Sequence, residues 1–206
     1  MNNSNAILET VRGLQAIPVD DVLLRDRKLF LTGPVTDESC NALISNLLYL
    51  ESEDSSSPIT LVINSPGGEV VSGLAVYDTI RLMKSPVYAV VCGIAASMGA
   101  IIYLAAEKDR RLMLPSSRIM IHDCSFGKKD IGGMKPFQIQ EELSQLEKTN
   151  ERLLSILAER CEKSPEEIAE VTRFDTYFDA DGAKEFGLCS GVIDTDNFST
   201  IMTKGA

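Results

Sequence analysis

The sequence has little of several residue types, and each shortage narrows the classes of protein to which it can belong. It contains no tryptophan and only one histidine among its 206 residues. Its 20 lysines and arginines are outnumbered by 30 aspartates and glutamates, which gives a net charge of −10. A negative field of this size repels phosphate backbones and anionic bilayers, so we expect neither a nucleic acid nor a membrane as a partner. Histidine-based acid–base catalysis would have one candidate, His122.

The five cysteines are scattered, and no two have the C-x-x-C spacing of a zinc site or a redox motif. Isolated thiols are typical of a reducing compartment, so we expect a cytoplasmic protein without a metal site. The N-terminus lacks a basic region followed by an apolar one, so we expect no secretory signal. The longest apolar stretch, from Val87 to Ala106, is interrupted by Gly93, Ser97 and Gly99. This favours a buried strand followed by a buried helix over a membrane span.

Length and patterning favour an α/β domain. Short apolar runs at 27–32, 59–63 and 87–92 read as strands, and they alternate with segments of helical periodicity. Such alternation predicts a mostly parallel sheet. Residues 1–17 carry little periodic signal, so we predict a flexible N-terminal segment, followed by one domain over residues 18–206.

A long helix is predicted from about Met134 to Cys161, roughly 40 Å long if it is unbroken. Its middle is rich in glutamine and glutamate. A partly polar helix of this length suggests an arm that reaches toward another subunit, and the alternative is a surface helix on its own domain. Ser164-Pro165-Glu166-Glu167 has the pattern of a capping box with proline at the first helical position, so a separate helix is predicted there.

Two adjacent glycines, Gly67 and Gly68, follow a predicted strand and precede a predicted helix. Glycines at such a junction allow unusual φ angles and let backbone N–H groups face a ligand, although a purely structural turn is the alternative. No Lys-Ser or Lys-Thr pair follows them, so the segment is not a P-loop.

Ser97 lies in the small-residue segment Ala95-Ala96-Ser97-Met98-Gly99, at a second strand-to-helix junction. A serine on such a turn can expose its Oγ at the sheet edge, and the next backbone N–H can bind an oxyanion. The hydrolase elbow has glycine where this chain has Ala95, so a buried packing serine is the alternative. His122 ends an apolar strand that could present it at the same edge, and the alternative is a hydrogen-bonded core histidine.

Together, the segments 63–68, 95–100 and 117–122 closely resemble, in order and spacing, the signature blocks of the Clp protease proteolytic subunit. The resemblance runs from about Asp26 to Asp194. It implies an α/β, crotonase-like spiral of β-β-α units with a long protruding handle helix, the handle covering about 124–161. It also implies a serine endopeptidase that encloses its substrate within two stacked heptameric rings, a tetradecamer.

The resemblance assigns roles residue by residue. It implies that Ser97 is the nucleophile, His122 the base and Asp175 the acid, with the backbone N–H groups of Gly68 and Met98 as the oxyanion hole. The neighbouring Asp123 should point to the opposite face of its strand, so it is a poor candidate for orienting the histidine.

Partners also follow from the resemblance. It implies an AAA+ ATPase unfoldase of the Clp type that uses ATP, while the subunit itself needs no cofactor. Substrates would be unfolded polypeptides, which is a task of protein quality control.

The chain departs from the family at several positions. Asp123 and Cys124 stand where the family has Gln-Pro, and Phe174 stands where it has arginine. Val62 and Leu112 replace aromatic residues of the pocket that receives the ATPase loop. These differences suggest a divergent paralogue whose rings are homomeric or mixed with a second subunit type.

Two alternatives to an active peptidase remain open. The first is a catalytically weak scaffold or regulatory subunit of a mixed-ring peptidase. The second is a crotonase-type acyl-CoA enzyme, which is disfavoured because the sequence offers no basic patch for the CoA phosphates.

Overall fold

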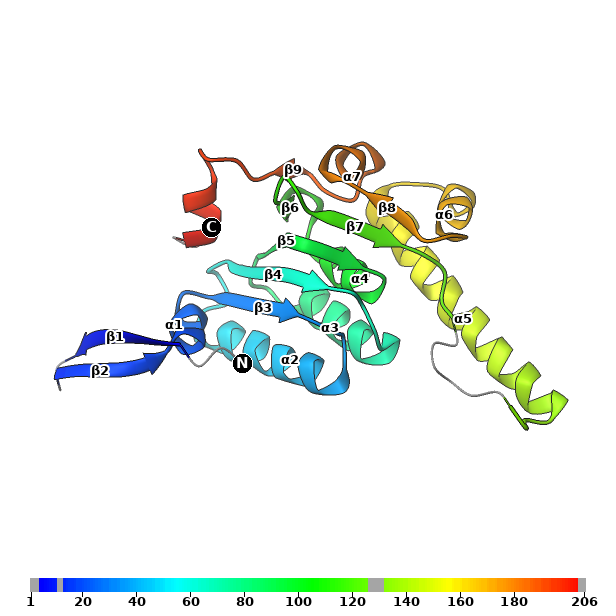
Figure 1. Cartoon of the computed structure of the whole chain (residues 1–206), viewed down its shortest axis with the longest axis horizontal. Helices are drawn as coiled ribbons and strands as arrows, with labels where there is room; N and C mark the ends of the chain where they lie inside the picture. Colours follow the sequence, from blue (N-terminus) through cyan, green and yellow to red (C-terminus); the bar gives the residue numbers. More distant parts are fainter. Residues whose placement is uncertain (1–3, 11–12, 126–131, 204–206) are drawn as a thin grey trace.

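The computed structural model describes residues 4–10, 13–125 and 132–203. Most of these residues form helices and strands, which Figure 1 labels in chain order. In that order, the elements are β1 (Asn5–Thr10), β2 (Gly13–Pro18), α1 (Val19–Arg25), β3 (Lys28–Thr32), α2 (Asp37–Glu53), β4 (Ile59–Ser65), α3 (Val70–Leu82), β5 (Val87–Ala96), α4 (Met98–Tyr103), the 3-10 helix η1 (Lys108–Arg110), β6 (Arg111–Met113), β7 (Arg118–Ile121), α5 (Pro136–Cys161), α6 (Pro165–Thr172), β8 (Thr176–Phe178), α7 (Ala180–Phe186), β9 (Gly191–Val192) and the π-helix η2 (Ser199–Thr203).

The main sheet is mostly parallel, as the alternation of strands and helices predicts. Its central path runs β3-β4-β5-β6-β9, and each pairing along this path is parallel. Strand β7 pairs in parallel with β5, and β8 adds to β7 in the antiparallel sense. The α/β fold class with a mostly parallel sheet is therefore confirmed.

Strand β5 forks the sheet, because its two halves have different partners on the same side. Residues 89–91 pair with β6, whereas residues 94–96 pair with β7. Gly93 lies between the two halves at φ +106°, and its amide donates to Ser117 Oγ at 3.0 Å. The fork carries β7 and β8 away from the central path and toward the end of β5, where Ser97 follows.

The core lies between the sheet and helices α2, α3 and α4, which lie side by side (Figure 1). Strand β4 is buried along nearly its whole length, and so is every residue of α4. A strand buried on both faces favours the β-branched run that residues 59–63 supply. The apolar stretch from Val87 to Ala106 thus forms a strand and a helix inside the domain, as predicted. In the described ranges, no helix has both the length and the apolar character needed to cross a bilayer.

Residues 5–10 and 13–18 pair as the two antiparallel strands of a hairpin that the sequence pattern did not indicate. Strands β1 and β2 pair from Asn5 opposite Pro18 to Thr10 opposite Gly13. Ile7 and Leu14 are 71% and 75% exposed, and none of the described side chains on the two strands is fully buried. The hairpin therefore packs little of itself against the domain. The flexibility of residues 1–17 stays a prediction.

Helix α5 projects from the domain through its N-terminal half and enters it through its C-terminal half (Figure 1). Phe137 is 68% exposed, whereas Leu153, Ile156 and Leu157 are buried. The helix is therefore an arm with a packed base rather than a helix lying along its own domain. The predicted handle range of 124–161 includes residues 126–131, which lie outside the described residues.

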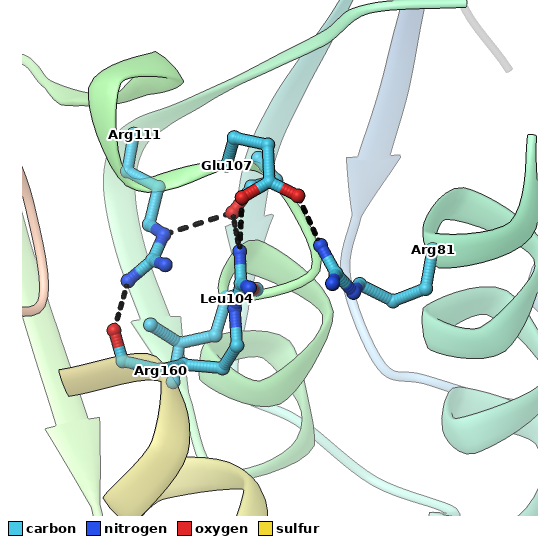
Figure 2. Close-up of polar contacts among 6 residues, drawn as sticks. Arg81, Leu104, Glu107, Arg111 and Arg160 are labelled. Carbon is cyan, nitrogen blue, oxygen red and sulfur yellow. Dashed lines mark hydrogen bonds and ion pairs between the residues drawn. The ribbon is translucent and has the colours of Figure 1, made fainter. Parts of the chain in front are cut away.

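Two buried arginines join the base of α5 to the C-terminal end of α4 (Figure 2). Arg160 donates to the carbonyl oxygens of Leu104 at 2.9 Å and Ala106 at 2.7 Å, and Arg111 donates to that of Ala106 at 2.9 Å. Arg111 is 1% and Arg160 8% exposed. Cations at the C-terminal end of a helix complement its dipole, and hydrogen bonds to carbonyl groups offset the desolvation of both guanidinium groups. The helix that begins at Met98 is thus fixed at its far end.

Candidate active site

Ser97 lies between β5 and α4 in an unusual backbone conformation. Its φ is +53° and its ψ −121°, a region that a non-glycine residue rarely occupies. The Ser97 amide donates to the Met120 carbonyl oxygen at 2.8 Å, which ties the turn to β7. Strain of this kind persists only where the surroundings enforce it. Here the turn lifts the serine side chain out of the strand toward the edge of the sheet.

His122 and Asp175 are brought together by the register of β7 and β8. Ile121 lies opposite Thr176 in the antiparallel pair. Continuing this register by one residue places His122 opposite Asp175, and cross-strand neighbours lie within side-chain contact. His122 Nδ1 is 2.9 Å from Asp175 Oδ1. The pairing is a direct result of strand register.

The second imidazole nitrogen completes a continuous hydrogen-bonded chain. His122 Nε2 lies 2.8 Å from Ser97 Oγ. A serine hydroxyl bonded to an imidazole, which is in turn bonded to a carboxylate, is an arrangement that can activate the hydroxyl as a nucleophile. The structure thus brings together three predicted residues that lie 25 and 53 positions apart in the sequence.

Gly67 and Gly68 approach neighbouring backbone closely because they have no side chains: Gly67 approaches the serine turn and Gly68 approaches Val35. A Cβ on Gly67, which has φ +87°, would lie 2.7 Å from the Ser97 Cβ and 2.6 Å from the Ala96 carbonyl oxygen. A Cβ on Gly68 would lie 2.2 Å from the Val35 carbonyl oxygen. Gly68 and Met98 line the same cleft as Ser97. Met98 is the first residue of α4, so its N–H has no partner within the helix.

The cleft beside the serine has a volume of about 220 Å³ and a mostly apolar wall. Its described lining contains no Asp, Glu, Lys or Arg side chain. One wall comes from α5, so the helix that forms the arm also shapes the site. The apolar lining residues are Val70, Met98, Ile101, Ile121, Leu146, Leu153, Leu154 and Leu157.

Asp123 is engaged away from His122, as the alternation of side chains along a strand suggests. Its Oδ1 accepts a hydrogen bond from Thr172 Oγ1 at 2.6 Å, and its amide donates to the Thr172 carbonyl oxygen at 2.7 Å. The next amide, that of Cys124, donates to Asn150 Oδ1 on α5 at 2.9 Å. Sequence reasoning did not single out Thr172 or Asn150, because neither lies in a motif next to a site residue.

Cys124 lines the cleft but is a poor second nucleophile. Burial raises the pKa of its thiol, and the charge of Asp123 raises this pKa further. The reactive form of cysteine is the thiolate, which a raised pKa disfavours. For metal binding, the described part of the chain contains no group of three or more His, Cys, Asp or Glu side chains suited to holding an ion.

Comparison with known families agrees with this fold. The family model of the Clp protease matches residues 12–196, a range that includes Ser97, His122 and Asp175. Members of this family are serine peptidases that work as oligomers with Clp ATPases, so the acyl-CoA alternative is set aside. The chain belongs to the Clp protease family.

Proposed function

We propose that this chain is the proteolytic subunit of a self-compartmentalising, ATP-dependent protease, and that it hydrolyses peptide bonds through Ser97, His122 and Asp175. The observation that carries the proposal is the unbroken chain of hydrogen bonds from the Ser97 hydroxyl through His122 to the Asp175 carboxylate, at 2.8 and 2.9 Å. These are the roles that a hydroxyl nucleophile, a general base and an orienting acid require.

In the first half of the reaction, Ser97 Oγ attacks the carbonyl carbon of the scissile peptide bond while His122 Nε2 takes the hydroxyl proton. The negative charge moves to the carbonyl oxygen, and the amides of Gly68 and Met98 donate to that oxygen. The tetrahedral intermediate then collapses. His122 gives its proton to the leaving amine, and the C–N bond breaks. The products are a free amine and an ester on Ser97.

In the second half, water replaces the amine. His122 Nε2 takes a proton from the water, whose oxygen attacks the ester carbonyl. Collapse of the second intermediate breaks the bond to Ser97 Oγ, which regains its proton from His122. The Asp175 carboxylate accepts a hydrogen bond from Nδ1–H throughout and stays ionised, so it fixes the tautomer and stabilises the imidazolium form.

The lining of the cleft suggests which peptides fit. Its wall is apolar and uncharged in the described residues, so an apolar side chain beside the scissile bond gains most from burial there. The family resemblance suggests that an extended peptide would run alongside the segment that precedes α5 and pair through main-chain hydrogen bonds; residues 126–131 of this segment lie outside the described residues. Unfolded polypeptides present such extended segments.

We propose the same assembly and partners as the family resemblance implies. Two heptameric rings, homomeric or mixed with a second paralogue, would cover the projecting half of α5, where Phe137, Ile139 and Leu143 are exposed. A Clp-type AAA+ unfoldase in the cytoplasm would use ATP, and the subunit itself would need no cofactor. Val62 and Leu112 lie in one row across β4, β5 and β6, on either side of Val90, where the resemblance suggests that the unfoldase docks.

A weak scaffold subunit is the second candidate, and one observation favours it. Phe174, at the position where the family has an arginine for contacts between rings, is 73% exposed. A subunit that lacks this contact would need a second subunit type to complete its particle. Purification with a second peptidase subunit, without labelling of Ser97, would identify this alternative.

Active-site labelling tests the proposed peptidase. The assembled protein is treated with a fluorophosphonate probe and assayed with fluorogenic peptides that carry an apolar residue before the scissile bond. We expect Ser97→Ala to abolish labelling and to lower hydrolysis by at least about 1,000-fold. Ser45→Ala, which changes an exposed serine on α2 away from the cleft, is the matched control and should retain both signals. An assembled wild-type particle that neither takes the label nor cleaves any peptide would refute the proposal.

A further inference from the structure

The packing around the Asp175 side chain does not explain how its carboxylate is held next to His122. Its side chain is 60% exposed, compared with 28% for His122. Close packing, which fixes buried side chains, therefore acts on it only weakly. Its position must come from the main chain that carries it, the short connection between α6 and β8.

One end of this connection is fastened to the histidine strand by two hydrogen bonds between the same two residues. Thr172 Oγ1 donates to Asp123 Oδ1 at 2.6 Å, and the Asp123 amide donates to the Thr172 carbonyl oxygen at 2.7 Å. Thr172 is fully buried at the end of α6, so it is a fixed point. Asp123 directly follows His122, and Thr172 comes three residues before Asp175.

The other end of the connection is held by the side chain of Thr176, which hydrogen-bonds to main-chain oxygens just before Asp175. Thr176 Oγ1 donates to the Val171 carbonyl oxygen at 2.7 Å and approaches that of Phe174 at 3.3 Å. Beyond it, Thr176 pairs with Ile121 in the sheet. The connection is therefore anchored on both sides of Asp175. After Asp175, the anchor is the pairing of β8 with β7; before it, the anchor is the pair of hydrogen bonds between Thr172 and Asp123.

We propose that Thr172 and Asp123 are positioning residues, which hold the Asp175 carboxylate against His122 Nδ1. This inference rests on the proposed function, because the held contact matters for turnover only if His122 is the base. Loss of the Thr172 hydroxyl leaves the Asp123 carboxylate without this donor and loosens the connection. Asp175 then drifts from Nδ1, and the imidazole loses the preference for the tautomer that leaves Nε2 free to accept the Ser97 proton.

Matched variants separate the hydroxyl from the bulk of the side chain. Thr172→Val keeps the shape and removes the hydroxyl, whereas Thr172→Ser keeps the hydroxyl. For the valine variant we expect kcat to fall by about 10- to 100-fold with KM within about twofold, since a misplacement of ~1 Å can cost that much. For the serine variant we expect kcat within about threefold of wild type. Asp123→Ala and Asp123→Asn are a second pair of variants, which change the acceptor of this hydrogen bond instead of its donor. They test the positioning role if Thr172→Val does not assemble.

A double-mutant comparison distinguishes positioning from general damage. If Thr172 acts through Asp175, then Thr172→Val should lower kcat by less than about twofold in a background that already carries Asp175→Asn. A merely structural role predicts the full loss in both backgrounds. Wild-type kcat in both Thr172→Val and Asp123→Ala, or full additivity with Asp175→Asn, would overturn the proposal.

The single histidine provides a readout that needs no activity. The 15N spectrum of the assembled protein, labelled at histidine and measured by magic-angle spinning, reports the tautomer of His122 alone. We expect the proton on Nδ1 in wild type and Thr172→Ser, and a mixture of tautomers in Thr172→Val. Absence of Ser97 labelling in wild type would count against the proposed function only. An unchanged imidazole spectrum in Thr172→Val would count against the positioning role.

Discussion

Arg111 Nη1 donates a hydrogen bond to the main-chain oxygen of Arg160 at 2.8 Å, so one buried cation helps to fix the backbone that carries the other. Both guanidinium groups also bind carbonyl oxygens beyond the end of α4 (Figure 2). The pair therefore joins three segments, the base of α5, the start of β6 and the end of α4. Its loss should affect the helix that follows Ser97.

Arg160→Met tests this junction. The variant removes the Arg160 donors to the Leu104 and Ala106 carbonyl oxygens, so the Ala106 oxygen keeps only the hydrogen bond from Arg111. We expect a loss of about 2–4 kcal/mol in the free energy of unfolding, measured as a lower melting temperature. Arg81→Met is the control, because Arg81 is 31% exposed at the outer end of the same network, and it should cost less than about 1 kcal/mol. Equal effects of the two changes would contradict the importance of the buried pair.

The Glu107 carboxylate should make the free energy of unfolding decrease as the pH falls. Burial tends to raise the pKa of its carboxyl, but the hydrogen bond from Arg81 and the charges of Arg160 and Arg81 outweigh burial and hold this pKa below its ordinary value of 4.5. A folded-state pKa below the unfolded value means that the stabilisation is present above the unfolded pKa and is lost as the pH falls through the folded pKa.

We therefore expect the melting temperature of Glu107→Gln to fall less steeply than that of wild type as the pH decreases from about 5 to about 3. Glu170→Gln, on the exposed side of α6, is the control and should follow wild type. Parallel curves for wild type and Glu107→Gln would show that this carboxylate contributes nothing to acid sensitivity.

Gly67→Ala should disable the serine turn through a steric collision. The new Cβ would meet the Ser97 Cβ and the Ala96 carbonyl oxygen, both closer than 3 Å, at a residue with φ +87°. We expect kcat for peptide hydrolysis to fall by at least about 100-fold, together with a loss of about 2–3 kcal/mol in stability. Gly33→Ala separates strain from collision, because Gly33 has φ +82° and open space around it. That control should cost about 1 kcal/mol and leave kcat unchanged.

Cys161 should resist alkylation in the native protein. The thiol is 3% exposed, and burial raises its pKa to about 11 despite the opposing charge of Arg111. Iodoacetamide reacts with the thiolate, which at a pH of about 8 is scarce at such a site. Mass spectrometry should find Cys161 unmodified in native protein and fully modified in concentrated urea. Rapid modification of the native assembled protein would mean that the base of α5 opens readily.

Much of the fold could be predicted from local patterns. The buried strands β4 and β5, the long α5 and the capping box at Ser164 all follow from periodicity and helix-capping rules, because these features depend on residues close in sequence. The hairpin of β1 and β2 was missed because its described side chains are exposed or only partly buried, so it has no buried apolar face for a pattern to reveal.

The site was predictable to different degrees. Ser97 and His122 stand out by residue type and by position at strand ends, whereas Asp175 could be assigned only through the family resemblance. A carboxylate is common on a surface, and only the register of β7 and β8 selects this one. The buried Arg111 and Arg160 were also missed, because an arginine in a sequence ordinarily indicates an exposed side chain.

The fork in β5 separates two kinds of engineering target within one sheet. Substitutions along the β6 branch act on pairings that close the central path, so they should appear mainly in thermal denaturation. Substitutions along the β7 branch act on the strand that leads to His122 and on its partner β8, so they should appear mainly in turnover. A library confined to one branch can therefore tune robustness or reactivity with little trade-off between them.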